Sequence, residues 1–212
     1  MALGLYLFYR WHIEGEDFPD MTTPQTWYTI KLFKARPSDP NTKEMTQAAH
    51  YKAVDKAFKN VGIYSRAKTH AGRKSGAKMA DIGEAGASQI RRAGRWMNDS
   101  MEGSYLTNLP RRMLRVLADF PAERGRFFLR RAAVKPSIEL CRKVFPLVEI
   151  RQAQIDANEG DNSIAADGFL KALRVLRETF LQDSVQMQEH LPHLSIWRHP
   201  LFSEPDYLQF KQ

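Results

Sequence analysis

A long apolar stripe between residues 163 and 190 constrains the fold of this chain more than any other feature. Apolar side chains recur there every three or four residues, at Ile164, Phe169, Leu170, Leu173, Leu176, Leu181 and Val185. This periodicity is typical of an amphipathic α-helix that buries one face. Similar spacing recurs in shorter segments between residues 41 and 133, so the sequence predicts a mainly α-helical fold.

Start and stop signals divide the rest of the chain into further helices. Asn41 followed by Glu44 resembles a capping box, and it predicts a helix that runs to about Asn60 and ends at Gly62. Glycines and prolines delimit the other predicted helices, which cover residues 70–83, 88–96, 99–109, 111–133 with a break at Phe120-Pro121, and 137–158.

Three segments have a less regular pattern. Residues 3–12 indicate the buried end of a helix, and a short strand is the alternative because the run is short and aromatic. Residues 27–33 are rich in β-branched and aromatic side chains, so they could form a strand, and the sequence predicts at most a small β element there. The tail after residue 190 contains three prolines and several aromatic residues, and it predicts an irregular packed arm.

The charge of the chain is concentrated in its middle. The chain has 32 Lys and Arg against 24 Asp and Glu, a formal net charge of +8. Residues 51–150 hold 21 basic and 9 acidic side chains, whereas the balance is −1 over residues 1–50 and −3 over residues 151–212. Such a block is the electrostatic footprint of a protein that binds a polyanion. A solvated basic face is the alternative, but an excess that extends over a hundred residues favours nucleic-acid binding.

Composition excludes several other classes of protein. With 43% hydrophobic and 26% charged residues, the chain resembles a globular protein rather than a collagen, a disordered chain or a disulfide scaffold. The single cysteine, Cys141, allows no internal disulfide and indicates a reducing compartment. The sequence contains no run of about 18 apolar residues, so it predicts no membrane-spanning helix. The first residues lack the features of a signal peptide.

One set of side chains between residues 68 and 107 suits phosphodiester chemistry. His70 and Arg73 are three residues apart on one face of a predicted helix, and Trp96 and Tyr105 follow in order. Metal-free transfer of a phosphodiester needs a nucleophile such as tyrosine, guanidinium groups on the phosphate oxygens and a proton-transfer group. Each residue alone is ordinary, since Trp and Tyr more often belong to a core. Their order on a basic background favours a shared site.

The segments THAGRKSGAKMA, QIRRAGRW and YLTNLPRRMLR resemble the tyrosine-recombinase family in its fungal branch. That branch includes Crypton-type mobile-element recombinases and the centromere-DNA-binding subunit of the yeast centromere-binding-factor (kinetochore) complex. LYLFYRWH, WYTIKLF and residues 145–149 are also similar to it, so the resemblance covers roughly residues 3–190. It implies a phage-integrase-like catalytic-domain fold that is amino-terminally incomplete. On this interpretation residues 1–136 form a partial DNA-binding domain and residues 137–212 form a helical extension.

The resemblance also implies a role for each member of the set. His70 and Arg73 correspond to the family's His-x-x-Arg pair, Trp96 to a third phosphate-contacting position and Tyr105 to the nucleophile. Such enzymes use a further Arg and Lys, and neither Arg10 nor Lys31 lies in a matching motif. Losing one charge-stabilising donor costs on the order of a hundredfold or more in rate, so strand transfer is not expected of this chain.

We therefore expect a nuclear protein that binds double-stranded DNA without strand transfer, without a cofactor and without a metal. The further side chains expected to contact DNA are Lys68, Lys74, Lys78, Arg91, Arg92, Arg95, Arg111 and Arg112. Two alternatives stay open. One is an active recombinase of Crypton type that forms a phosphotyrosine, and the other is a protein-interaction domain that uses the 163–190 helix and the tail. A homodimer and kinetochore-type protein partners are further expectations.

Overall fold

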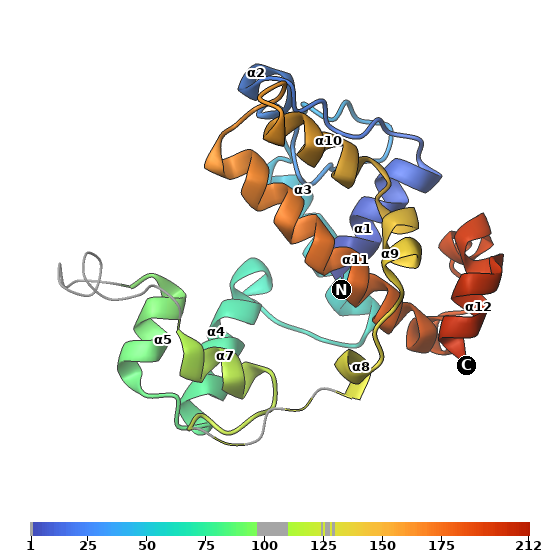
Figure 1. The fold of residues 1–212 in the computed structure, drawn as a ribbon. Coiled ribbons are helices and arrows are strands. Elements are labelled where there is room, and N and C mark those ends of the chain that lie inside the picture. The colour runs from blue at the N-terminus through green and yellow to red at the C-terminus, as the bar shows by residue number, and fades with distance from the viewer. Residues whose placement is uncertain (1, 97–109, 124, 126–127, 129) are drawn as a thin grey trace. The chain divides into compact units, whose positions relative to one another are not determined.

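The fold is mainly α-helical, as expected. The computed structural model describes residues 2–96, 110–123, 125, 128 and 130–212, and every regular element within these ranges is helical (Figure 1). None of the described helices is long and apolar enough to cross a lipid bilayer. The helix expected over residues 99–109 lies outside the described residues.

The elements are numbered in chain order. They are α1 (Ala2–Phe8), the π-helical turn η1 (Tyr9–Ile13), α2 (Pro24–Trp27), α3 (Gln47–Asn60), α4 (Lys68–Ile82), α5 (Ala87–Gly94), α7 (Arg111–Leu117), α8 (Arg130–Ala133), α9 (Ile138–Val144), α10 (Leu147–Asp156), α11 (Ile164–His190), the 3-10 turns η2 (Ser195–Arg198) and η3 (Pro200–Ser203), and α12 (Pro205–Lys211).

The sequence allowed at most a small β element at residues 27–33, and the structure has no strand there. Thr23 and Thr26 form a capping box around a one-turn helix whose first residue is Pro24, so the chain turns at this point instead of extending. The amide of Lys31 then donates a hydrogen bond to the carbonyl of Asn41. Residues 3–12, in contrast, are helical as expected, in α1 and η1.

Several predicted helix boundaries also need correction. Helix α3 begins after Thr46, whose hydroxyl accepts from the amide of Ala49, and not at Asn41. The single helix predicted over residues 137–158 is divided into α9 and α10 around Pro146, which has no N–H to continue the ladder. The helix predicted from residue 111 ends at Leu117, just before Asp119 adopts a left-handed conformation with φ 64°.

The chain divides into two compact units. Unit 1 consists of residues 1–44 and 129–212, and unit 2 consists of residues 45–128. The amino-terminal segment thus shares a unit with the carboxy-terminal helices. The functional division expected at residue 136 does not coincide with this boundary, and it stays a prediction.

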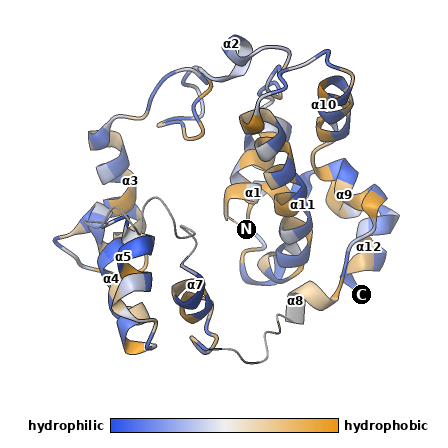
Figure 2. Ribbon diagram, turned by 60° about the vertical axis from the view of Figure 1, so that its left-hand side comes forward, coloured by the Kyte–Doolittle hydropathy of each residue, from blue (hydrophilic) through white to orange (hydrophobic). Residues whose placement is uncertain are grey.

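Helix α11 is the centre of the unit 1 core. Phe8 of α1 stacks on Phe180 of α11 with ring centroids 4.9 Å apart. Gly4 brings α1 close to α11, because a Cβ at this position would lie 3.1 Å from the carbonyl oxygen of Leu176. Figure 2 shows hydrophobic residues along both helices. Fully buried residues of the same core include Leu140, Val144, Phe145, Leu170, Leu173 and Leu181.

The carboxy-terminal tail is more regular than the irregular arm that we expected. It forms the two short 3-10 turns and α12, and its aromatic residues complete the unit 1 core. Tyr207 is fully buried and its hydroxyl lies 2.8 Å from that of Ser184 on α11. The hydroxyl therefore has a partner, which is why a tyrosine can occupy this position.

Unit 2 has a small core where α4, α5 and α7 meet. Ala80, Ala85 and Met113 are buried there. Gly83 at the end of α4 lies so close to α7 that an added Cβ would be 2.2 Å from Cγ1 of Val116. Few large side chains are buried among the residues of unit 2 that the structure describes. Short helices and close backbone contacts therefore position the surface residues of this unit.

Candidate nucleic-acid interface

The positive charge of the chain resides in unit 2. Residues 45–128 contain 16 Lys and Arg against 7 Asp and Glu, a formal net charge of +9, whereas the residues of unit 1 contain 16 against 17, a net charge of −1. Unit 2 therefore has the field that attracts a polyanion, and unit 1 has almost no net charge.

Helix α4 carries the first part of the site that the sequence indicated. His70, Arg73, Lys74 and Lys78 are all exposed. At about 100° per residue, His70, Lys74 and Lys78 follow one another around one side of the helix, and Arg73 lies on the other side of His70. This helix therefore offers three cations and one imidazole to the solvent along about two turns.

Lys68 differs from the other cations of α4 because it is already paired. Its Nζ lies 2.5 Å from the carboxylate of Asp55 on α3, and its side chain is only 15% exposed. Hydrogen bonds from Lys59 and Lys68 lower the pKa of the Asp55 carboxyl. This partner was not predictable from the sequence, since residues so far apart in the chain give no local signal.

Arg73 and Trp96 are brought together by the structure. The guanidinium carbon of Arg73 lies 4.9 Å from the Trp96 ring centroid, and the same group donates a hydrogen bond to the carbonyl of Gly94. The indole folds back onto Gly94, where a Cβ would lie 2.6 Å from Cδ2 of Trp96. Gly94 is thus the residue that makes room for the stack, a role that was not predicted from the sequence.

The end of α5 places three more arginines beside this stack. Arg91 and Arg95 are exposed, and Arg92 is half-buried. Arg95 adopts a left-handed conformation with φ 53° that ends the helix, and the amide of Trp96 then donates to the carbonyl of Arg91. This tight reversal brings the indole back over the helix end. Nε of Arg92 has no hydrogen-bond partner within the described residues.

The arginines of α7 are partly engaged within unit 2. Nη2 of Arg112 lies 3.0 Å from the carboxylate of Glu123, and both side chains are largely exposed. The amide of Arg112 donates to the side-chain carbonyl of Gln89 on α5, and Nε of Arg115 donates to the carbonyl of Pro121. Arg111 is exposed. Exposed pairs of this kind are worth little in stability, so they leave the arginines able to meet another anion.

Of the four residues predicted to share a site, His70, Arg73, Trp96 and Tyr105, two are in contact. Arg73 and Trp96 touch, and His70 is one turn from Arg73 on the same helix. Tyr105 lies outside the described residues. Among the described side chains, no group of three or more His, Cys, Asp and Glu could hold a metal ion.

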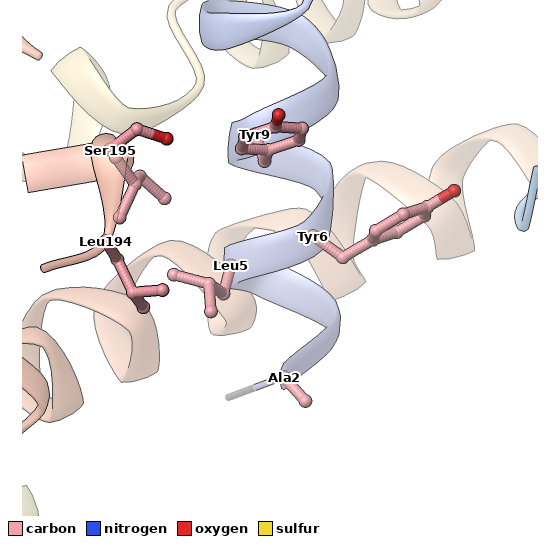
Figure 3. Close-up of a pocket in the computed structure, with 7 residues that line it drawn as sticks. Ala2, Leu5, Tyr6, Tyr9, Leu194 and Ser195 are labelled. Carbon is pink, nitrogen blue, oxygen red and sulfur yellow. The ribbon is translucent and has the colours of Figure 1, made fainter. Parts of the chain in front are cut away.

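An apolar cavity of unit 1 has a different character. It measures about 280 Å³ and lies between α1 with the start of η1 and the start of η2, where Leu5, Tyr9 and Leu194 line it (Figure 3). A hydrogen bond with Glu14 raises the pKa of the Tyr9 hydroxyl, so this phenol stays protonated. The lining has no nucleophile–base pair and no cluster of cations, and it offers neither acid–base chemistry nor phosphate binding.

Comparison with known protein families gives a match over nearly the whole chain. The family described as centromere DNA-binding protein complex CBF3 subunit, domain 2, matches residues 1–208 and thus nearly the whole chain. No curated protein and no solved structure matches the chain.

Proposed function

This chain belongs to the family of domain 2 of the centromere DNA-binding protein complex CBF3 subunit, and from this premise we propose that it binds double-stranded DNA in the nucleus. The contact surface is the part of unit 2 formed by α4, the end of α5 and the start of α7. The family description also supports protein partners within a complex, and a homodimer stays a prediction.

The stack of Arg73 on Trp96 carries the proposal. A guanidinium has five N–H donors in a planar fork that matches the oxygens of a phosphate. The indole covers one face of the group and the Gly94 carbonyl accepts one hydrogen bond, so the orientation is set before a ligand arrives. Preorganisation reduces the entropy cost of binding. The same unit carries the whole charge excess, which supports a phosphate of DNA as the anion.

The finer part of the proposal is a tyrosine-recombinase-like surface that binds DNA without cutting it. His70, Arg73, Trp96 and Tyr105 are its family positions, and Lys74, Lys78, Arg91, Arg92, Arg95, Arg111 and Arg112 are proposed phosphate contacts. We place Lys68 last among these cations, because it is paired with Asp55 and its side chain is only 15% exposed.

The environment of Arg10 supports the absence of strand transfer. An active enzyme would need a further guanidinium, and Arg10 is one of the two residues that could supply a missing group. It is only 4% exposed, and it donates to Glu16 and to the backbone carbonyls of Lys31 and Leu32. Every nitrogen of this group has a partner within unit 1, so Arg10 is a structural residue in the described fold.

A binding assay and a cleavage assay on the same samples test the proposal. The full chain should shift a duplex in a gel at low salt, and Arg73→Ala should weaken this binding. A nicked suicide duplex should give no covalent adduct, and Tyr105→Phe should change binding by no more than about 1 kcal/mol, the worth of one hydrogen bond.

Two results would overturn the proposal. A denaturant-resistant adduct that disappears with Tyr105→Phe would establish the recombinase alternative. A failure to bind duplex DNA at any salt concentration, with the fold intact, would favour the protein-interaction alternative.

A further inference from the structure

Helix α3 of unit 2 presents a row of lysines that the proposed surface does not use. Lys52, Lys56 and Lys59 are spaced by four and three residues, so they lie within about 60° of one another on the helix. All three are exposed. None of the 14 residues of this helix is buried, so the row is not a by-product of a packed face.

The side of α3 that packs against the rest of unit 2 lies away from this row of lysines. Val54 and Phe58 are the half-buried large apolar residues of the helix, and α3 contacts α4. On a helical wheel these two residues lie roughly opposite Lys52 and Lys56. The lysines therefore point away from α4, towards the solvent.

The row keeps most of its charge. Asp55 is the one acidic residue of α3, and its carboxylate is shared by Lys59 at 2.7 Å and Lys68 at 2.5 Å. Lys52 and Lys56 make no ion pair with any residue that the structure describes. Two unpaired cations and one shared cation thus remain on a single helix face.

We propose that the lysine row of α3 is a second contact for the DNA backbone, beyond the surface formed by α4, α5 and α7. The proposal rests on the proposed function, because it assigns a second DNA contact to the same unit. At 1.5 Å per residue the row is about 10 Å long, which corresponds to about three base-pair steps of 3.4 Å along the duplex axis. It would extend the footprint on DNA without reading its sequence.

The chemistry of this face favours DNA over an acidic protein. The centre of a protein interface has buried aromatic or other large anchors. Beside the lysines, α3 instead has Ala48 and Ala53, which are small and exposed. The exposed aromatic residue of this helix, Tyr51, lies about 100° from Lys52 and about 80° from Lys59, so it borders the row without lying in it. Small residues let a phosphate backbone approach closely, whereas they offer a protein partner no anchor.

The test measures how the wild type and a variant without the three lysine charges bind DNA duplexes of two lengths. Lys52→Gln, Lys56→Gln and Lys59→Gln are combined in the full chain, since Gln and Lys have similar helix propensities and the fold should persist. Binding is measured against salt for duplexes of about 12 and about 30 base pairs. The control combines Lys135→Gln, Lys171→Gln and Lys211→Gln, three lysines of unit 1.

The expected result is a change that depends on length. For the long duplex, the log–log salt slope of the row variant should fall by up to about 2.7, at about 0.9 for each phosphate that a lysine no longer neutralises. For the short duplex, which the first surface alone occupies, the slope should not change. The control variant should match the wild type on both duplexes.

The other outcomes separate the two proposals. If the wild type binds neither duplex, the proposed function fails and this inference fails with it. If the wild type binds both and the row variant has unchanged slopes, the lysine row is not a DNA contact, although the proposed function stands. A variant that keeps both slopes but loses binding to a polyglutamate probe would identify a site for acidic protein, which also contradicts the inference.

Discussion

The guanidinium of Arg73 stacks on the indole of Trp96, with the central carbon 4.9 Å from the ring centroid. One side chain thereby connects the middle of α4 with the end of α5. The two residues lie 23 positions apart in the sequence, and the stack orients an exposed cation in the most basic part of the molecule.

The stack should be measurable as a coupling between the two side chains. At an exposed site a cation–π contact is worth about 0.5–1 kcal/mol, so the unfolding free energies of Arg73→Ala, Trp96→Ala and the double variant should give a coupling of that size. Lys74→Ala combined with Trp96→Ala is the matched control and should give a coupling near zero. Equal couplings in the two cycles would mean that the contact does not stabilise the fold.

Gly94→Ala should disrupt the site while leaving unit 2 folded. The new Cβ would lie 2.6 Å from Cδ2 of Trp96, so the indole must move away from its place under Arg73. DNA affinity should fall, but by less than with Arg73→Ala, because the guanidinium and its hydrogen bond to the carbonyl of residue 94 remain. In the control, Gly76→Ala, the Cβ meets nothing within 4 Å on α4, and stability should rise by about 0.5–1 kcal/mol with unchanged DNA affinity. Unchanged binding by Gly94→Ala would separate the stack from DNA recognition.

Glu16 should make the stability of unit 1 sensitive to acid. Burial alone would raise the pKa of this carboxyl, but hydrogen bonds and charge from Arg10 and Lys34 outweigh burial and lower it. Since the folded pKa lies below the unfolded value, the stabilisation is complete above the unfolded pKa and is lost as the pH falls through the folded one. Glu16→Gln should cost about 3 kcal/mol at pH 7, because it leaves a buried guanidinium unpaired.

Denaturant unfolding at pH 7 and at pH 3 tests this expectation. The variant should be the less stable protein at pH 7, and its stability should depend less on pH over the acid range. DNA affinity should remain that of the wild type. A loss of DNA binding without loss of stability would place Arg10 in the DNA-binding site instead.

A pair of histidines should destabilise unit 1 at mildly acidic pH. The rings of His12 and His199 have centroids 5.0 Å apart, and both pack on Phe8. Burial lowers the pKa of His12 more than its hydrogen bond with the Val144 carbonyl raises it. Burial and the neighbouring His12 lower the pKa of His199. The folded state therefore binds fewer protons than the unfolded state, and stability should decrease as the pH falls below about 6.5.

His199→Asn provides the measurement for this pair. Nδ1 of His199 accepts a hydrogen bond from the amide of Leu201, and Asn is a good capping residue that retains such an acceptor without titrating in this range. The variant should lose part of the stability change between pH 7.5 and pH 5.5. A pH dependence identical to that of the wild type would assign the effect to other groups.

Local sequence patterns predicted most of the helices, but they predicted the residues at which the helices begin and end less well. The stripe that begins at Ile164 became α11, with Ser163 as its N-cap, because that pattern extends over many turns. The helix start at Asn41 was wrong, and the small β element that residues 27–33 allowed is absent, because caps at Thr46 and Thr23 lie only a few residues away. Such choices depend on tertiary contacts, which a short window does not contain.

The candidate site was predictable as a list of residue types but not as a set of contacts. The order of Arg73 and Trp96 in the chain suggested a shared site, and the two side chains do touch. Lys68 forms an ion pair with Asp55, and Gly94 leaves space for the indole. Both features depend on how segments distant in the sequence approach one another. No spacing rule within one helix could have indicated either.

The salt dependence of DNA binding tests the central claim most directly, and the decisive comparison removes three charges from one unit or from the other. One variant combines Arg91→Gln, Arg92→Gln and Arg95→Gln at the end of α5, and its matched control neutralises three exposed arginines of unit 1, Arg36, Arg142 and Arg198. If unit 2 holds the DNA, the log–log slope of affinity against salt should fall by up to about 2.7 in the first variant and stay at the wild-type value in the control. Equal slopes in the wild type and both variants, or an equal fall in the two variants, would contradict the claim that unit 2 is the DNA-binding surface.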